Sequence, residues 1–288
     1  MPYVIHLLIM VSIYSILALS LNLVVGFTGL VFVAAAAFFG IGAYVTAIVM
    51  TSFGFNFFLA CIVGALFSAL IAFAIGAVLS KFRGDYYTLA SVGFNIIIYS
   101  VFLNWQTVTR GPLGIPGIPR PSIFGLSFSD NFSFLILASL LVILVFLACR
   151  FIEQSSFGRV LRAIREDEKA VSVFGYEVLY FKLATFVVAA AFSAFAGSLY
   201  ASYITFIDPS TFFVNESIFI LAVVILGGLA SNRGAVLGAA VLVLLPEALR
   251  FVGFPPDIAA QMRQVVYGLL LVILMMYRPQ GLMGEYKL

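Results

Sequence analysis

Charged residues are scarce in this chain: they make up 9% of its 288 residues, whereas 64% are hydrophobic and the mean hydropathy is +1.18. Soluble domains usually carry about 25% charged residues. A surface in water cannot be covered by so few polar groups, so the scarcity excludes an ordinary soluble protein and indicates one that lies in lipid. At roughly 20 residues per spanning helix, the length has room for eight to ten spans and for no separate soluble domain.

Residues that carry enzyme and cofactor chemistry are also few. The single histidine, His6, lies in the first apolar run, where packing or an interface is the simpler interpretation. Both cysteines, Cys61 and Cys149, lie inside apolar runs, which favours neither a disulfide nor a metal cluster. The sequence contains no glycine-rich phosphate loop that ends in Lys-Ser or Lys-Thr. We therefore expect no catalytic residue, no metal and no cofactor, and any ATP hydrolysis must occur on a separate polypeptide.

Ionisable residues are rare inside the apolar runs, and Glu216, Glu247 and Arg250 fall near the ends of runs. Carriers driven by protons or sodium usually need a buried carboxylate or an unwound cation site. The scarcity favours energy supplied from outside the chain and a neutral or zwitterionic solute. An ion-coupled secondary transporter or channel is the alternative. An intramembrane enzyme is disfavoured because His, Cys and carboxylate clusters are missing.

The apolar runs are continuous rather than alternating, which favours helices over the strands of a membrane barrel. The second and seventh runs are rich in glycine and alanine, so a plain span and a broken or re-entrant helix are both open alternatives for them. The first lacks the basic start and cleavage site of a signal peptide and is expected to stay as a span. The prediction is an all-α transmembrane helix bundle of about nine spans, with eight to ten possible, forming a single transmembrane domain over residues 1–288. The nine runs are 3–25, 28–50, 57–80, 86–103, 132–150, 181–203, 214–230, 235–252 and 262–277.

Basic residues indicate the orientation of the bundle. The segment 150–182 holds six of the fifteen Lys and Arg residues, which places it in the cytoplasm by the positive-inside rule. When successive loops are assigned alternately to the two sides of the membrane, eleven basic residues lie inside. The N-terminus then lies outside and the C-terminus inside, in agreement with an odd number of spans. The four basic residues left outside are Arg110, Arg120, Arg250 and Arg263.

The outer loop 104–131 is rich in proline and glycine. Proline removes a backbone donor and both residues interrupt regular structure, so we expect this loop to cap the outer face without regular helix or ladder.

The inner loop 150–182 is the most charged part of the chain. Its charged residues recur at helical spacing on one face, and glycine at each end permits sharp turns. The pattern predicts one or two short amphipathic helices on the cytoplasmic face. A helix lying on anionic lipid is one interpretation. Five acids beside six bases favour a protein partner, because paired signs set register and specificity.

Polar and aromatic residues within the spans are candidates for the solute path. Asn22 and Asn95 are the leading polar candidates, and Phe38 and Phe39 could form an apolar gate. Hydrogen bonds between helices and plain core packing are the alternative roles for such residues.

Several segments, in order along nearly the whole chain, resemble the LivM-type permease of branched-chain amino acid ABC transporters. They include SLNLVVGFTGLVFVAAAAFFGIGAY at 20–44, RGDYYTLASVGFNIII at 83–98, NWQTVTRGPLGIPGIP at 104–119, the stretch that begins FGRVLRAIRED at 157, and YRPQGLMG at 277–284. The resemblance implies a multi-pass permease of the bacterial inner membrane that forms half of a translocation path. It also implies three kinds of partner: a LivH-like second permease, two cytoplasmic ABC ATPases and a periplasmic binding protein. The implied cargo is branched-chain amino acids, although similar permeases carry urea, short amides or other amino acids.

In that family the cytoplasmic loop couples the permease to its ATPases. Carried over by position, Ala170 and Val171 occupy the Ala-Ala positions of the coupling motif and Gly175 its glycine, while Lys169 stands where the motif has Glu. The residues expected to couple the ATPase are Gly158, Arg159, Arg162, Ala163, Arg165, Glu166, Asp167, Ala170 and Gly175.

Overall fold

A computed structural model of the chain describes residues 2–82, 84–123, 126–128 and 130–250, with short stretches between 265 and 284. Within these residues, six helices are long and apolar enough to cross a membrane, and the all-α membrane bundle predicted from the sequence is confirmed. Two shorter apolar helices follow them. The six are α1 (Pro2–Thr28), α2 (Ala35–Ser52), α3 (Phe57–Leu79), α4 (Asp85–Asn104), α6 (Asn131–Gln154) and α9 (Val178–Ile204); the two are α10 (Val214–Gly227) and α11 (Asn232–Arg250). Each of the first eight predicted runs overlaps with one of these helices, and the ninth, 262–277, lies outside the continuously described residues.

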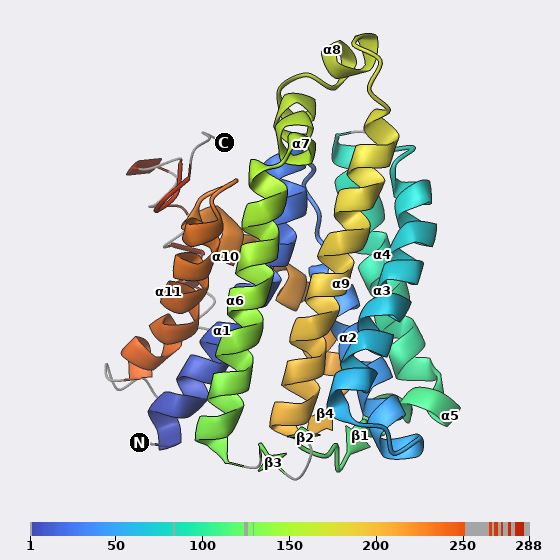
Figure 1. The fold of residues 1–288 in the computed structure, drawn as a ribbon, viewed down its shortest axis with the longest axis vertical. Coiled ribbons are helices and arrows are strands. Elements are labelled where there is room, and N and C mark those ends of the chain that lie inside the picture. Colours follow the sequence, from blue (N-terminus) through green and yellow to red (C-terminus); the bar gives the residue numbers. More distant parts are fainter. Residues whose placement is uncertain are drawn as a thin grey trace.

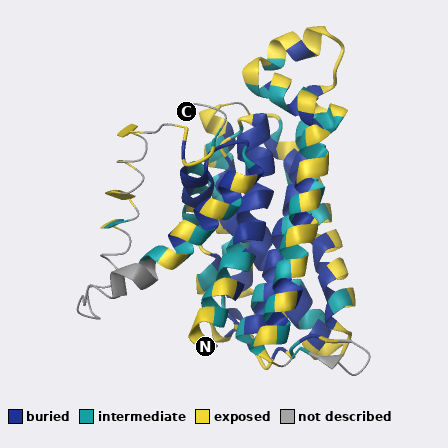
Figure 2. Ribbon diagram, turned by 60° about the vertical axis from the view of Figure 1, so that its left-hand side comes forward, coloured by how far each residue is buried: buried dark blue, intermediate teal, exposed yellow. Residues whose placement is uncertain are grey.

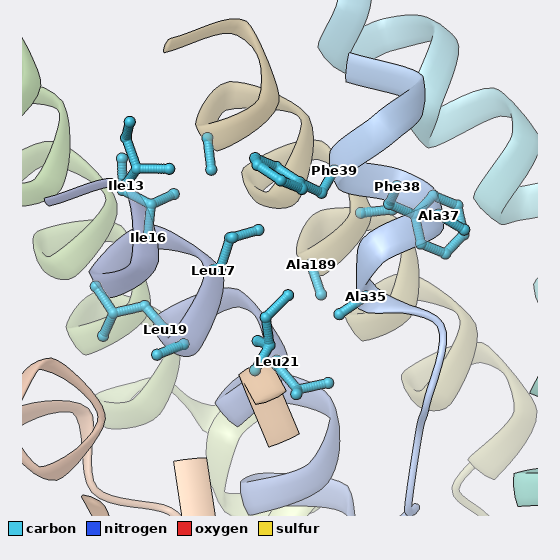
Figure 3. Close-up of a cluster of buried hydrophobic side chains, with 14 of the residues drawn as sticks. Ile13, Ile16, Leu17, Leu19, Leu21, Ala35, Ala37, Phe38, Phe39 and Ala189 are labelled. Atoms are coloured by element: carbon cyan, nitrogen blue, oxygen red, sulfur yellow. The ribbon is translucent and has the colours of Figure 1, made fainter. Parts of the chain in front are cut away.

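The core lies around α9, which packs against α1, α2 and α3 (Figure 1). Figure 3 shows side chains of α1 and α2, among them Leu17, Phe38 and Phe39, meeting in this core. Small residues bring α2 and α9 into backbone contact, because a Cβ on Gly197 would lie 2.1 Å from the Phe39 carbonyl oxygen. Such close approach is how helices associate when lipid supplies no hydrophobic driving force between them.

The outward faces of the long helices are apolar. Leu66 and Leu70 on α3 are both 65% exposed, and Leu140 and Ile143 on α6 are both 59% exposed. Figure 2 shows exposed residues along the outer sides of the long helices. Contiguous apolar faces of this length are unfavourable in water and are the normal surface of a helix in lipid. The chain is thus a multi-pass membrane protein.

The second helix, α2, begins inside the bundle and not at its end. Its first residue, Ala35, lies beside Ala189 near the middle of α9 (Figure 3). Of the two alternatives for the second run, the structure shows a helix that starts within the bundle and not a plain span. The predicted start at residue 28 is wrong, because Gly29 takes a φ of +73° and ends α1 there.

Residues 29–34 return into the bundle as non-helical chain. Two side chains of α4 satisfy its backbone: the Thr88 hydroxyl donates to the Val31 carbonyl at 3.1 Å, and the Val33 N–H donates to Ser91 Oγ at 3.1 Å. Non-helical backbone at membrane depth needs such partners, because lipid offers none.

The seventh predicted run also yields a short helix that starts inside. Near the first turn of α10, Glu216 accepts a hydrogen bond of 2.5 Å from Tyr14, close to the middle of α1. The next residue, Ser217, accepts one of 2.9 Å from the Ala36 N–H at the start of α2. The two interior helix starts thus lie next to each other.

The opposite end of the bundle from α7 is closed by the loop 104–131 and the segment after α9 (Figure 1). The loop contains α5 (Gln106–Thr109), a 3-10 turn (Gly111–Leu113), β1 (Ile115–Pro116), β2 (Ser122–Ile123) and β3 (Leu126–Ser127). β2 pairs with β3, and β1 pairs antiparallel with β4 (Phe206–Ile207), which precedes a 3-10 turn (Pro209–Phe212). The expectation of no helix or ladder was wrong, although glycine and proline limit each element to a few residues.

Described basic residues divide between the two ends as expected. Lys182 and Arg233 lie at the end that carries α7, whereas Arg110 and Arg120 lie in the loop at the other end. Five basic positions of the predicted split fall outside the residues whose side chains are described: Arg83, Arg250, Arg263, Arg278 and Lys287.

Candidate coupling site

Two short helices, α7 (Ser156–Glu166) and α8 (Glu168–Val173), stand beyond the long helices at one end of the bundle (Figure 1). They are the one or two amphipathic helices predicted for the loop 150–182. α7 follows α6 after a single residue, Ser155, whose hydroxyl oxygen accepts a hydrogen bond of 3.2 Å from the Gly158 N–H. This N-cap satisfies one of the free donors that every helix start leaves.

Gly158 allows α7 to lie against the end of α6. A Cβ at this position would lie 2.4 Å from the Ile152 carbonyl oxygen and 2.6 Å from that of Glu153. Real Cβ atoms do not approach backbone so closely, so glycine is needed for the joint between the two helices.

Arg159 and Arg162 of α7 also bond to the end of α6. Arg162 Nη2 donates to the Glu153 carbonyl at 2.9 Å, and Arg159 donates to the Gln154 carbonyl at 3.4 Å. The last carbonyls of a helix lack partners within it and favour positive charge. The two arginines therefore stabilise the end of α6, a role that helical spacing alone did not reveal.

Asp167 and Gly175 mark the two ends of α8. Asp167 Oδ1 accepts hydrogen bonds from the N–H groups of Lys169 and Ala170, at 2.9 and 3.1 Å, and so caps the helix start. Gly175 takes a φ of +86°, which side chains rarely adopt, and turns the chain toward α9. Asp167, expected from the sequence only as a coupling residue, is thus a helix cap.

The α7–α8 unit, residues 156–178, has a small core of its own. Ile164, Val171 and Val178 are buried together. The ammonium group of Lys182 on α9 lies 2.6 Å from the Glu168 carboxylate and ties α8 to that helix. The unit is therefore held in place by internal packing and by α9.

The outer side of the α7–α8 unit combines exposed charge with exposed apolar residues. Ala163, Glu166, Lys169 and Ala170 are exposed. At the tip, Val173 is 85% exposed and Phe174 is 82% exposed. Between α7, α8 and the start of α9 lies a groove of about 600 Å³ whose lining includes Phe157, Val160, Phe174, Tyr176 and Phe181.

Arg165 connects the unit to the membrane helices. Its guanidinium donates to the carbonyl of Gly26, in the last turn of α1. Its side chain also packs on Gly29, where a Cβ would lie 2.9 Å from Arg165 Cγ. The arginine thus contacts the chain that leads from α1 into α2.

Asn22 lies at the same end of α1 and is fully buried. Its Oδ1 accepts from the Ala230 N–H at 3.0 Å, and its Nδ2 donates to Asn232 Oδ1 at 3.3 Å. Asn232 Nδ2 in turn donates to the Glu153 carboxylate at 2.7 Å. One predicted path residue is therefore part of a polar network with the turn between α10 and α11 and with the end of α6.

The other path candidates, Phe38, Phe39 and Asn95, are at most 1% exposed. Phe38 packs on Phe94, and Phe39 on Phe212. They lie deeper in the bundle than the α7–α8 unit, on helices that its residues do not belong to.

Asn95 sits beside the interior starts of α2 and α10. Its Oδ1 accepts from Ser217 Oγ at 3.3 Å. Its Nδ2 is buried and has no hydrogen-bond partner among the described residues. A buried amide nitrogen whose two N–H donors lack a described partner is uncommon and marks a functional candidate.

Sequence reasoning missed Gly26, Glu153 and Asn232 as parts of this site. Their partners are far away in the sequence, as with the 210 positions between Asn22 and Asn232. The available signals were the glycines of GFTG at 26–29 and the polar turn ASNRG at 230–234, inside otherwise apolar sequence.

Comparison with known proteins identifies the chain. Residues 3–275 match the family described as branched-chain amino acid transport system / permease component. The chain belongs to this permease family. The permease is 36% identical to the high-affinity branched-chain amino acid transport system permease proteins LivM of Salmonella typhimurium and Escherichia coli. Those alignments cover 95% and 94% of this chain and 68% of each relative.

Alignments with more distant relatives extend over almost the full length of those proteins. The permease is 26% identical to a probable LivM protein of Methanocaldococcus jannaschii, over 97% of this chain and 92% of the relative. It is 29% identical to the LivH permease protein of Escherichia coli, over 95% of this chain and 92% of the relative. No solved structure matches the permease.

Proposed function

We propose that this permease is the LivM-type subunit of an ABC importer and forms half of a translocation path for branched-chain amino acids. ATP hydrolysis takes place on two separate cytoplasmic ATPases. A LivH-like permease completes the path, and a periplasmic binding protein delivers the solute. The identity to the LivM protein of Escherichia coli is 36%, against 29% to the LivH protein of the same organism, and this difference supports the choice of subunit. Urea, short amides or other amino acids are the alternative cargo.

The observation that carries this proposal is the α7–α8 unit. It stands beyond the long helices, has its own core, and exposes Val173, Phe174 and charges of both signs. A carrier driven by an ion gradient needs no such docking element, whereas a subunit driven by a separate ATPase does. The excess of basic residues at this end favours a cytoplasmic location.

The remaining site predictions fit the same proposal. Gly158, Asp167 and Gly175 shape the α7–α8 unit, Arg159 and Arg162 hold it to α6, and its exposed surface contacts the ATPase through Ala163, Glu166 and Ala170. Phe38, Phe39 and Asn95 line the solute path in the state that opens it, whereas Asn22, first predicted for that path, acts through its polar network at the α7 end. The unused donors of Asn95 support its assignment, since a zwitterionic solute could accept a hydrogen bond from them.

The test changes residues of the α7–α8 unit in the reconstituted importer. Val173→Ser/Phe174→Ser should lower ATP-driven uptake by about tenfold and weaken co-purification of the ATPases, because buried apolar anchors dominate most interfaces. Exchanging the charges of Arg162 and Glu166 should uncouple ATPase stimulation from uptake without preventing insertion. Phe53→Ser, on a 68% exposed residue at the other end, is the control.

Unchanged transport in both variants would contradict the coupling assignment. Uptake by the permease alone, in vesicles with an ion gradient and no ATPase, would favour a secondary transporter instead. A thermal-shift screen of the cognate binding protein against leucine, isoleucine, valine, urea and short amides would identify the cargo.

A further inference from the structure

The α7–α8 unit contacts the two short interior helices through different residues at one level of the bundle. Arg165 reaches the chain that leads into α2, through the Gly26 carbonyl and the contact with Gly29. Arg162 donates to the backbone of Glu153, whose carboxylate accepts from Asn232 in the turn after α10. Both helices that begin inside the bundle are therefore held, at the α7 end, by contacts that start on α7.

Asn22 closes this network on the membrane side. Its amide accepts the Ala230 N–H just after α10 and donates to Asn232. A Cβ on Gly26 would lie 2.2 Å from Asn22 Oδ1 and 2.6 Å from the Ala230 nitrogen, so α1 and the turn after α10 touch directly. Because Asn22 is fully buried, no water can replace either bond when it breaks.

The two interior helices, α2 and α10, are also joined to each other at their first turns. The Ala36 N–H at the start of α2 donates to Ser217 in the first turn of α10. Hydrogen bonds at Val31 and Val33 fix the chain between Gly29 and α2 to α4. This segment therefore cannot absorb a displacement by straightening or bending on its own. A shift of α7 must then reach α2 and α10 together.

On the basis of the proposed function, we infer that Arg165 and Asn22 are positioning residues that transmit movement of the α7–α8 unit to α2 and α10. Arg165 acts on the entry to α2, and Asn22 acts on the exit from α10. Neither needs to touch solute or ATPase. Their loss should separate ATP hydrolysis from transport while the complex still assembles.

The experiment measures ATP hydrolysis and uptake together in proteoliposomes that contain the complete importer. Arg165→Gln and Asn22→Leu should each keep the ATPases bound and ATP hydrolysis within about twofold of wild type. Each should lower uptake per ATP by about tenfold, equivalent to about 1.4 kcal/mol of coupling free energy. Arg165→Lys, which keeps the charge and a donor, should restore part of the lost uptake.

Matched controls exist for both changes. Lys81→Gln removes an exposed positive charge near the same end. Thr28→Val removes a buried hydroxyl of α1 that bonds Val24 of its own helix at 2.6 Å. Both should keep wild-type uptake per ATP.

The outcomes separate the two proposals. If the wild-type importer shows no ATP-driven uptake, the proposed function fails. Suppose instead that the wild-type importer transports. The transmission role is then wrong if Arg165→Gln and Asn22→Leu keep the wild-type uptake per ATP. It is also wrong if both variants lose uptake and ATP hydrolysis in the same proportion. If the Asn22→Leu variant does not assemble, the uptake per ATP of Arg165→Gln, compared with that of Arg165→Lys, tests the transmission role.

Discussion

At the α7–α8 end, charged side chains hold the helices together, whereas at the β1–β4 end aromatic rings and short ladders do so. Arg162 and Arg165 bind carbonyls at the ends of α6 and α1. Toward the other end, Phe212 packs with Tyr44 and Phe102, and the rings of Tyr44 and Phe102 stack at 4.4 Å between centroids.

The difference indicates how each end can change. Charge-assisted bonds near water can be exchanged one at a time when a charged partner binds. Closely packed rings move only together, because a core tolerates neither voids nor overlaps. The α7–α8 end is therefore suited to receive a signal, and the aromatic end to stay closed until several elements move.

The largest effect should come from Gly158→Ala. The new Cβ would overlap two carbonyl oxygens of α6 and displace α7, so the charge-held end loses its geometry. We expect ATP-driven uptake to fall by more than about tenfold, with a permease that still inserts and stays folded. Gly93→Ala is the control, because no atom lies within 4 Å of its Cβ position. Equal uptake in the two variants would show that the joint between α6 and α7 is unimportant.

Phe212→Ala should affect the aromatic end instead. Removing a buried ring that is 1% exposed should destabilise the fold by about 3–5 kcal/mol, visible as a lower thermal midpoint in detergent. It should also raise uptake that is independent of ATP, because a closing element is lost. Phe39→Leu keeps more side-chain volume in the same cluster, so it should lower the thermal midpoint and raise ATP-independent uptake to a smaller extent. A variant that loses coupling but shows no leak would contradict the comparison of the two ends.

The smallest effect should come from Glu168→Gln. The ion pair with Lys182 is partly exposed, with 37% of the Glu168 side chain accessible, so its loss should cost about 0.5 kcal/mol. We expect faster hydrogen exchange confined to α8, and nearly normal uptake. Exchange that rises equally in α10 or α11 would show that α8 is not an independent part of the charge-held end.

The sequence predicted the fold well where one physical rule dominates. Continuous apolar runs identified the long helices because lipid requires every backbone group to be bonded within the helix. Helical spacing of charge predicted the short helices of the loop 150–182. Both signals are local, so a single sequence contains them.

The sequence could not predict which groups those side chains would meet. Arg162 looked like a surface residue by spacing, yet it binds the end of α6, because the turn at Gly158 folds α7 back. Asn22 looked like a residue of the solute path, and its partners at Ala230 and Asn232 are set by tertiary packing. The start of α2 was misplaced because the bonds from Thr88 and Ser91 that hold residues 29–34 come from another helix.

The adjacent interior starts of α2 and α10 also have an electrical consequence. Each helix N-terminus carries roughly half a positive charge, and the surrounding low-dielectric interior strengthens its field. Two such ends meet around Ala36 and Ser217, near the middle of the bundle. The Glu216 carboxylate, which lies in the first turn of α10 and accepts a hydrogen bond from Tyr14, is in this positive field and is stabilised by it. The paired helix starts therefore account for an acidic residue within the bundle, where a charge without a partner would be costly.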